Sequence, residues 1–242
     1  MARLRPQTTT SLVELIAKEI KVSILSGTLR PGEPFSIAEL SNELDVSHIP
    51  VREALRRLEA DGLVQLRPSR SAIVTPLSVE ELAEIYQLRL LVEVDLAARA
   101  APSYTNQQLE LAESLCEELH KPHGAANPHE REVHHRFHEN LLLPAAGVHA
   151  SRMLWRLWEA SDRYIGLVYD ALPIAPEEPY RRHRLLLQAA QKKRGPVMRK
   201  ALADHLGESL EYMMASLDVV LSEGDGATPE GADKVPAKAA SG

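Results

Sequence analysis

Four histidines in the second half of the chain have a spacing that suits a divalent metal ion. His134 and His138 are four residues apart in a helical pattern, so both imidazoles project from one face of that helix. His183 begins the apolar stretch of a later helix, and His205 lies in the last one. Helical bundles commonly build internal metal sites from ligands on several helices. The spacing therefore predicts a metal at these four residues, with two surface histidines as the alternative for the His134/His138 pair.

Six helices are needed to position these histidines. Capping-box patterns, Ser78 with Glu81 and Thr105 with Gln108, begin the first two. The predicted helices cover about 78–101, 105–120, 129–143 and 150–171, then a fifth after the proline-punctuated link 173–179 and a sixth from Gly195-Pro196 to about 221. No strand pattern follows Thr75. We therefore predict an all-α helical bundle over residues 77–221.

The segment from residue 46 to residue 74 predicts a different unit. A helix is expected over 48–60, with Ser47 as N-cap and Pro50 tolerated in its first turn. Its apolar residues recur at three- and four-residue steps: Val51, Ala54, Leu55 and Leu58. A short helix beginning at Ser36 precedes it, and two β-like runs, 63–67 and 72–75, follow it. This order predicts a winged helix-turn-helix.

The outer face of the 48–60 helix has the chemistry for reading DNA. A helix in the major groove needs a donor-rich face, and arginine can bond guanine or phosphate. The predicted DNA-contacting residues are Ser47, His48, Arg52, Arg56, and, at the ends of the hairpin, Arg67 and Arg70. The alternative is an ordinary surface helix whose arginines are only solvated.

Composition and charge support two domains. The 242 residues are 44% hydrophobic but only 4% aromatic, and the formal charge is -6. Residues 1–78 hold 10 Lys+Arg against 9 Asp+Glu, so the acidity lies in the rest of the chain. The single cysteine, Cys116, is expected to be buried. Without a signal peptide or a long apolar run, the sequence predicts a cytoplasmic protein and no membrane partner.

The predicted fold is mainly α: an N-terminal winged helix-turn-helix domain followed by an all-α bundle. We expect a flexible arm over residues 1–10, the winged helix-turn-helix domain over 11–76, the bundle over 77–221 and a disordered tail over 222–242, where Gly, Ala, Pro, Glu and Lys predominate.

The N-terminal motifs resemble the GntR family of bacterial transcription regulators. The resemblance rests on SGTLRPG at 26–32, AEL at 38–40, VS at 46–47, PVREALRRL at 50–58 and DGLV at 61–64. Two residues depart from the family pattern, which usually has arginine at the position of His48 and glycine at that of Ser71. Because a neutral imidazole is a weaker donor than a guanidinium, the resemblance implies an altered operator affinity or sequence preference.

The helical part resembles the FCD effector domain that is often joined to the GntR domain. The matching segments are EL at 81–82, IY at 85–86, LR at 88–89, FHE at 137–139, HR at 183–184 and HL at 205–206. The resemblance implies that the last three carry metal ligands. The family typically has aspartate at the position of His134. A four-histidine site would favour zinc, with nickel or copper as alternatives. The alternative is that His134 does not ligate. Its neighbour His135 is expected to be exposed.

An FCD domain implies an effector that is a small organic acid held at the metal. Arg89 resembles a family position that faces this cavity and could pair with the acid, with Glu93 one turn on to orient it. The alternative for Arg89 is a surface salt bridge with Glu93 or Glu84.

The functional prediction is a metabolite-responsive, non-enzymatic transcription factor. We expect a homodimer that binds an inverted repeat in double-stranded DNA, and a repressor whose operator binding changes when a small carboxylate binds. Two alternatives remain open at this point: a metal-dependent hydrolytic enzyme with an accessory DNA-binding module, and a regulator whose metal is purely structural.

Overall fold

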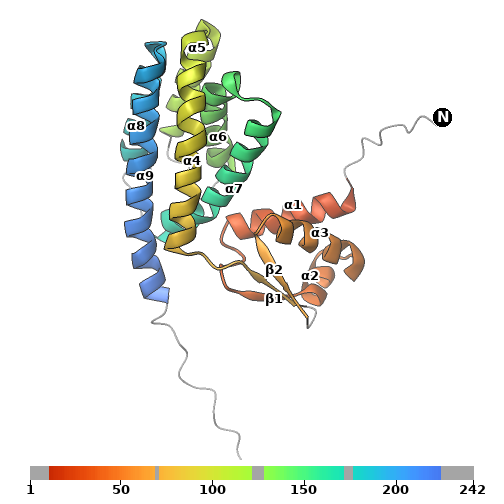
Figure 1. The fold of residues 1–242 in the computed structure, drawn as a ribbon. Helices are drawn as coiled ribbons and strands as arrows, with labels where there is room; N and C mark the ends of the chain where they lie inside the picture. The colour runs from red at the N-terminus through yellow and green to blue at the C-terminus, as the bar shows by residue number, and fades with distance from the viewer. Residues whose placement is uncertain (1–10, 69–70, 122–127, 172–176, 225–242) are drawn as a thin grey trace, which may run out of the picture.

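The computed structural model describes residues 11–68, 71–121, 128–171 and 177–224. The N-terminal domain contains α1 (Leu12–Leu25), β1 (Pro34–Ser36), α2 (Ile37–Glu43), α3 (His48–Ala60), β2 (Val64–Arg67) and β3 (Ser71–Val74). The second domain contains α4 (Val79–Ala100), α5 (Asn106–Leu119), α6 (Pro128–Leu142), α7 (Val148–Ala171), α8 (Glu177–Gln191) and α9 (Gly195–Gly224), with 3₁₀ turns at Ala101–Ser103 and Leu143–Ala145. Figure 1 shows the winged helix-turn-helix domain beside one end of the bundle, which confirms the predicted fold class.

The small domain forms around the recognition helix α3. Four apolar side chains of α3, at the predicted positions, are at most 2% exposed: Val51, Ala54, Leu55 and Leu58. They pack against Ile16, Ile20 and Ile24 of α1, which recur at four-residue steps along that helix. Ser11 and Ser36 close capping boxes with Glu14 and Glu39 and so fix where α1 and α2 begin. The polar side of α3 is therefore left facing outward.

One strand was not predicted. β1 pairs with β3 in antiparallel register, with Phe35 opposite Ala72, so that the sheet order is β1-β3-β2. A three-residue strand that begins with Pro34 is too short to show an alternating pattern. The strand forms because β3 offers its free edge and because Phe35 fits into the core of the domain, where it is 9% exposed.

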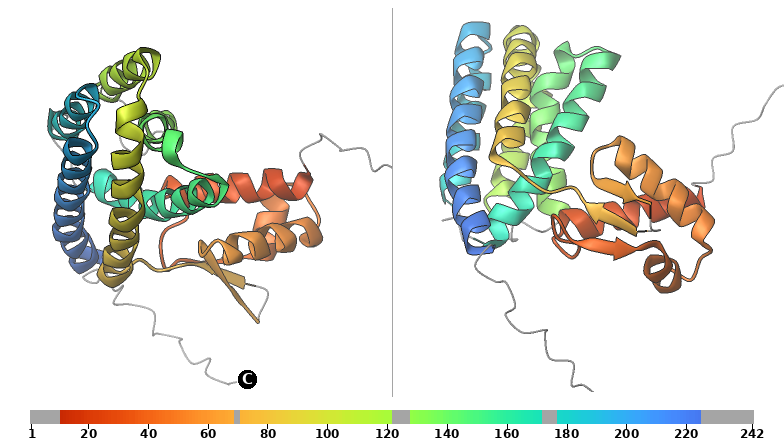
Figure 2. Two further views of the ribbon diagram at one scale, coloured as in Figure 1. Left: turned by 45° about the horizontal axis from the view of Figure 1, so that its top comes forward. Right: turned by 60° about the horizontal axis from the view of Figure 1, so that its bottom comes forward.

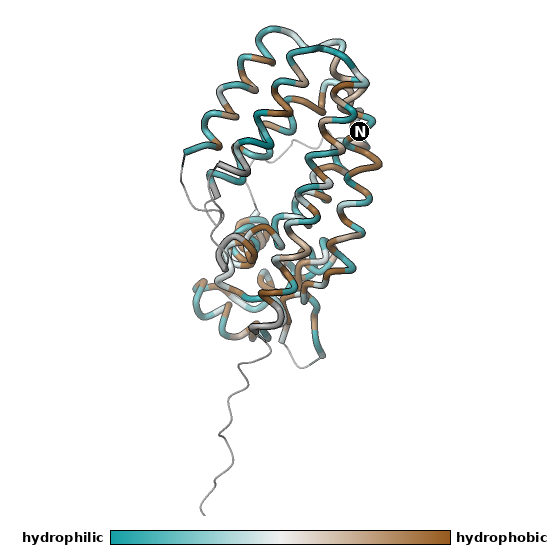
Figure 3. The backbone as a smooth tube through the Cα atoms, turned by 90° about the vertical axis from the view of Figure 1, so that its left-hand side faces the viewer, coloured by the Kyte–Doolittle hydropathy of each residue, from teal (hydrophilic) through white to brown (hydrophobic). Residues whose placement is uncertain are grey.

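The bundle is organised around α4, which packs along α9 and contacts α6 and α7. Brown and teal segments alternate along the helices in Figure 3, as expected for helices with one buried side. Gly195, the first residue of α9, lies so close to α4 that a Cβ built there would be 2.6 Å from the main-chain oxygen of Ala98. The start of α9 is therefore fixed against α4 by main-chain contact.

The two domains touch at one end of the bundle (Figure 2). Arg163 of α7 donates hydrogen bonds to the carbonyl oxygens of Thr75 (2.8 Å) and Pro76 (3.4 Å) in the connection between the domains. Arg131 of α6 donates to the carbonyl oxygen of Leu25 at the end of α1 (3.0 Å). Since all three bonds join side chains of the bundle to main-chain atoms of the small domain or of the connection, the relative position of the domains depends on α6 and α7.

The last helix extends to Gly224, a few residues beyond the end near Leu221 that the sequence predicted. The predicted arm, 1–10, and the tail beyond residue 224 lie outside the described residues. Among the described helices, none combines the length and the apolar composition needed to cross a membrane.

Replacing Gly195 by alanine is expected to destabilise the protein by about 1–3 kcal/mol, because the added methyl group must displace the Ala98 carbonyl. The control is Gly207→Ala in the same helix, where a Cβ meets nothing within 4 Å. This change should be neutral or stabilise the protein by about 0.5–1 kcal/mol. Urea denaturation of both variants measures the difference, and equal midpoints would contradict the close approach of α9 to α4.

Candidate metal centre and DNA-reading surface

The structure brings the four predicted histidines together inside the bundle. Ring nitrogens of His134 and His138 of α6 and of His183 of α8 all lie within 4.8 Å of one another. His205 of α9 lies beside this group, with its ring centroid 4.9 Å from that of His183 and 5.3 Å from that of His138. Side chains of three helices, α6, α8 and α9, therefore converge on one cluster.

These imidazoles lie in an environment that favours their neutral form. Burial lowers the pKa of His134, His138 and His205 well below the ordinary value, and neighbouring imidazoles lower it further. Within the described part of the chain, neither ring nitrogen of His138 has a hydrogen-bond partner, and Nδ1 of His205 has none either. A neutral imidazole with an unused lone pair is a good ligand for a divalent metal.

The residues fit a metal ion of the zinc type. Zinc binds imidazole nitrogens at about 2.0–2.1 Å, so that tetrahedral ligand atoms are roughly 3.3 Å apart. The ring nitrogens of His134, His138 and His183 lie close enough to reach that geometry with small side-chain rotations. Buried nitrogens without partners are costly unless something binds them, and a metal would remove that cost. The cluster therefore could hold one metal through three histidines, with His205 as an adjacent fourth.

A small cavity adjoins the cluster. Its volume is about 50 Å³, enough for one or two water-sized groups. The lining residues come from α4, α6, α7, α8 and α9 and include Arg89, His134, His183, His205, Arg182 and Tyr212. The cavity could place a water molecule or the carboxylate group of a small acid next to the histidines.

Arg89 lines this cavity and is buried. It therefore does not form the surface salt bridge that was the alternative interpretation of the sequence. Its side chain is 4% exposed, and Nε donates to Oε1 of Glu93, which is fully buried, at 2.7 Å. The same Glu93 oxygen accepts a hydrogen bond from Nε1 of Trp158 (2.9 Å), and Nη1 of Arg89 donates to Ser161 (3.3 Å). Although burial alone would lower the pKa of Arg89, the Glu93 carboxylate raises it. Arg89 is therefore a fixed cation at the cavity wall.

The prediction that His135 is exposed was wrong. Its side chain is 12% exposed, and Nε2 lies 3.2 Å from Oδ1 of Asp162. The ring stacks on Trp158, with 5.6 Å between the centroids, and meets Trp155 edge-on. α7 packs over this side of α6, which a helical pattern in α6 alone does not reveal.

Sequence reasoning missed three polar cavity residues: Arg182, Ser209 and Tyr212. Each was close to a predicted ligand in sequence. Arg182 precedes His183, and Ser209 and Tyr212 follow His205 by four and seven residues, a spacing that places all three of these α9 residues on one face of the helix. That periodicity was the available signal.

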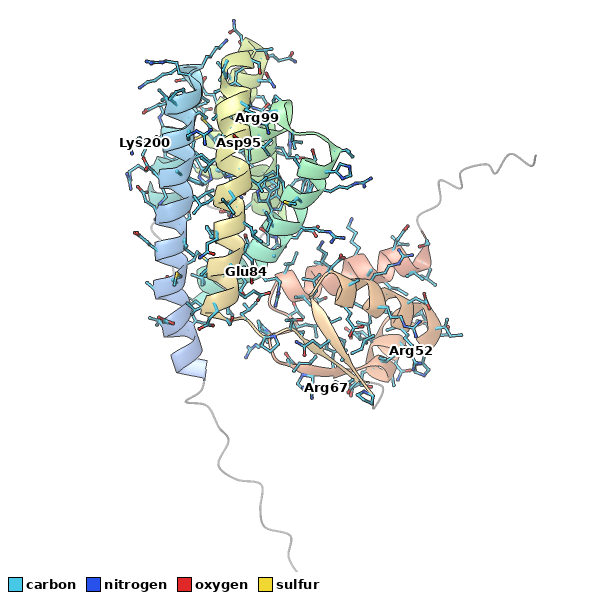
Figure 4. The ribbon with its side chains drawn as sticks, viewed as in Figure 1. Arg52, Arg67, Glu84, Asp95, Arg99 and Lys200 are labelled. Carbon is cyan, nitrogen blue, oxygen red and sulfur yellow. The ribbon has the colours of Figure 1, made fainter. Side chains whose placement is uncertain are left out.

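The exposed face of α3 lies away from the bundle. His48, Arg52 and Arg56 are exposed, as is Arg67 at the end of β2. Figure 4 shows Arg52 and Arg67 on the side of the small domain that faces away from the helical domain. The remaining predicted contact, Arg70, lies outside the described residues. We call the exposed residues Ser47, His48, Ile49, Arg52 and Arg56 the DNA-reading surface.

Ser47 does occupy the N-cap position of α3, but its side chain makes no capping hydrogen bond. The predicted capping bond was therefore wrong. Pro50, the third residue of the helix, has no N–H to donate, which removes one of the two usual donors to an N-cap side chain. The exposed hydroxyl of Ser47 is consequently available to another partner.

The fold and these two sites define a two-domain, DNA-binding transcription regulator. The family described as "Bacterial regulatory proteins, gntR family" matches residues 12–74, and the FCD domain matches residues 84–208. The chain therefore belongs to the GntR family and carries an FCD domain.

Named relatives support the same family assignment. The chain is 30% identical over 200 residues to the HTH-type transcriptional repressor RspR of Escherichia coli K12, which covers 81% of this chain and 86% of that protein. It is 26% identical to the HTH-type transcriptional regulator McbR of the same organism, over 84% of this chain and 93% of McbR. The solved structure of E. coli McbR/YncC superposes with a TM-score of 0.70 at 23% identity, covering 86% of this chain and all of that one. These relatives are regulators rather than enzymes, as the sequence predicted.

Replacing Glu93 by glutamine is expected to destabilise the protein by about 3–5 kcal/mol, because Arg89 is left as an uncompensated buried cation. Asp95→Asn is the matched control, since Asp95 forms an i,i+4 ion pair with Arg99 on an exposed part of α4 (Figure 4). This change should alter the free energy of unfolding very little. Denaturant midpoints measure both effects, and a Glu93 variant as stable as the Asp95 variant would contradict this account of the pair.

Proposed function

We propose that this regulator is controlled by a small organic-acid metabolite held at a divalent metal, zinc or alternatively nickel, in the helical domain. The observation that carries the proposal is the buried histidine cluster beside a cavity with a fixed arginine. In this proposal His134, His138 and His183 hold the metal, with His205 as the fourth ligand. The bound metal would act as a Lewis acid toward a carboxylate oxygen.

Arg89 gives the cavity its preference for an anion. Its position is fixed by Glu93 and Ser161, so an acid meets an oriented guanidinium without a large rearrangement. The volume of about 50 Å³ admits little more than a carboxylate group, so the rest of a longer acid would have to open the bundle. A compact carboxylate is therefore the proposed effector class.

The route to DNA is the contact between domains. α6 carries both His134 and Arg131, which bonds the end of α1, and α7 carries Arg163, which bonds the interdomain connection. A shift of α6 or α7 on effector binding would reach the small domain through these bonds. The mechanism is a population shift between orientations of the DNA-reading surface.

We further propose a cytoplasmic homodimer that binds an inverted repeat as a repressor. Two copies of the DNA-reading surface would contact two half-sites. The relative RspR is named a repressor, which supports repression rather than activation. Leu88 and Leu91 support dimerisation, since they are 42% and 74% exposed on the outer side of α4. Burial of such leucines between two chains would stabilise a dimer.

Operator binding tests the proposal. An operator is first selected from a random duplex pool, and its Kd is then measured by fluorescence anisotropy with zinc-loaded protein and with acetate, glycolate or succinate. At least one acid is expected to weaken binding about tenfold, a typical coupling between two sites. The effect should disappear in His138→Ala, which removes a proposed ligand, and persist in His149→Ala, which changes an exposed histidine.

Two results would contradict the proposal. If zinc binds stoichiometrically but no acid changes the Kd, the metal is structural and the regulator ignores these effectors. If the acids act equally on the wild-type and His138→Ala proteins, the effector does not use the cluster.

A further inference from the structure

The first turn of α3 combines two side chains that are unusual for a surface that binds DNA. His48 is an exposed imidazole rather than a guanidinium, and Ile49 is 75% exposed. Both follow the N-cap Ser47, at the end of the recognition helix that contacts base edges in helix-turn-helix proteins. Their chemistry differs from that of Arg52 and Arg56 farther along the helix.

A hydrogen-bond relay fixes which nitrogen of His48 carries the proton. Nδ1 of His48 lies 3.1 Å from Oγ of Ser41, a buried residue of α2. The hydroxyl of Ser41 donates to the carbonyl oxygen of Ile37 at 2.7 Å, so its oxygen is left as an acceptor. Nδ1 of His48 must therefore be the donor in the 3.1 Å contact, and this network assigns the neutral ring its proton at Nδ1. Nε2 is consequently an acceptor.

Every base pair presents one exocyclic amino group to the major groove, so an acceptor at this position selects which strand carries the adenine or cytosine. Guanine offers only acceptors, N7 and O6, to the major groove, and phosphate oxygens are acceptors as well. The major-groove donors are the exocyclic amino groups of adenine (N6) and cytosine (N4). We propose that His48 reads such an amino group through Nε2, and that Ser41 is the positioning residue that sets this preference.

Ile49 adds a second determinant. An isoleucine that is 75% exposed gains by removing apolar surface from water, and the apolar group in the major groove is the 5-methyl of thymine. Because His48 and Ile49 are consecutive residues, they contact the same or neighbouring base pairs. Each half-site therefore holds an adenine or cytosine on the strand that His48 reads, with a thymine in the same or a neighbouring base pair. This specificity rests on operator binding within the proposed function but not on the metal or the effector.

The test is selection of duplexes from a random pool at pH 8, where free imidazole is neutral, by the full-length wild-type protein and by H48R, S41A and I49A. Wild type should enrich adenine or cytosine at one position of each half-site, on the strand where H48R selects guanine, and the selected base distinguishes the two sources of the amino group. H48R should change that position to guanine and leave the others unchanged. S41A should weaken the preference at that position alone, an effect that a merely structural role of Ser41 would not produce.

Base analogues then isolate the two contacts in the selected operator. Removing the exocyclic amino group of the selected adenine or cytosine should weaken wild-type binding about five- to tenfold and leave H48R unaffected. Replacing the thymine by uracil should weaken wild-type binding about threefold and leave I49A unaffected.

On the strand where H48R selects guanine, guanine or thymine in the wild-type selection would overturn the assignment to His48. Equal loss on uracil substitution in wild type and I49A would overturn the assignment to Ile49. A wild-type protein that is folded but enriches no sequence would refute operator binding itself, and with it the proposed function.

Discussion

The stability of the helical domain depends on what binds its buried imidazole nitrogens. Both nitrogens of His138 and Nδ1 of His205 lack hydrogen-bond partners within the part of the chain that the structure describes, in a region where such groups cost free energy. An apolar core of the same volume would have been more stable, so the cluster is best explained by a ligand for these nitrogens. The adjacent Arg89–Glu93 pair carries a similar cost. Both charges are buried, and each is stabilised by the opposite charge of the other.

The same helices connect this cluster to DNA binding. α6 supplies two of the four histidines and also holds the end of α1, whereas α7 covers the cluster through Trp158 and holds the interdomain connection through Arg163. Gly166 of α7 adds a steric constraint, since a Cβ there would lie 2.8 Å from the carbonyl oxygen of Leu25. A movement of α6 or α7 would therefore act directly on main-chain atoms of the small domain and of the interdomain connection.

Much of this organisation could be predicted from the sequence. Periodicity and caps placed α3 at the residues it occupies, and the spacing of His134 and His138 put both on one face of α6. The failures have a common cause: they depend on neighbours distant in the sequence. β1 exists because β3 pairs with it, and His135 is covered by α7. The missing cap of Ser47 is the exception, since Pro50 was visible in the sequence and its absent N–H could have been taken into account.

The most direct test of the central claim is the zinc content of the full-length protein after dialysis against zinc and removal of excess metal. We predict one zinc per chain in the wild-type protein and in an H129A/H149A control, whose histidines are exposed, and none in H138A/H183A. Zinc at 100 times its Kd should stabilise the wild-type protein by about 2.7 kcal/mol and leave H138A/H183A unchanged. Wild-type protein without zinc, or stoichiometric zinc in H138A/H183A, would contradict a metal centre at the histidine cluster.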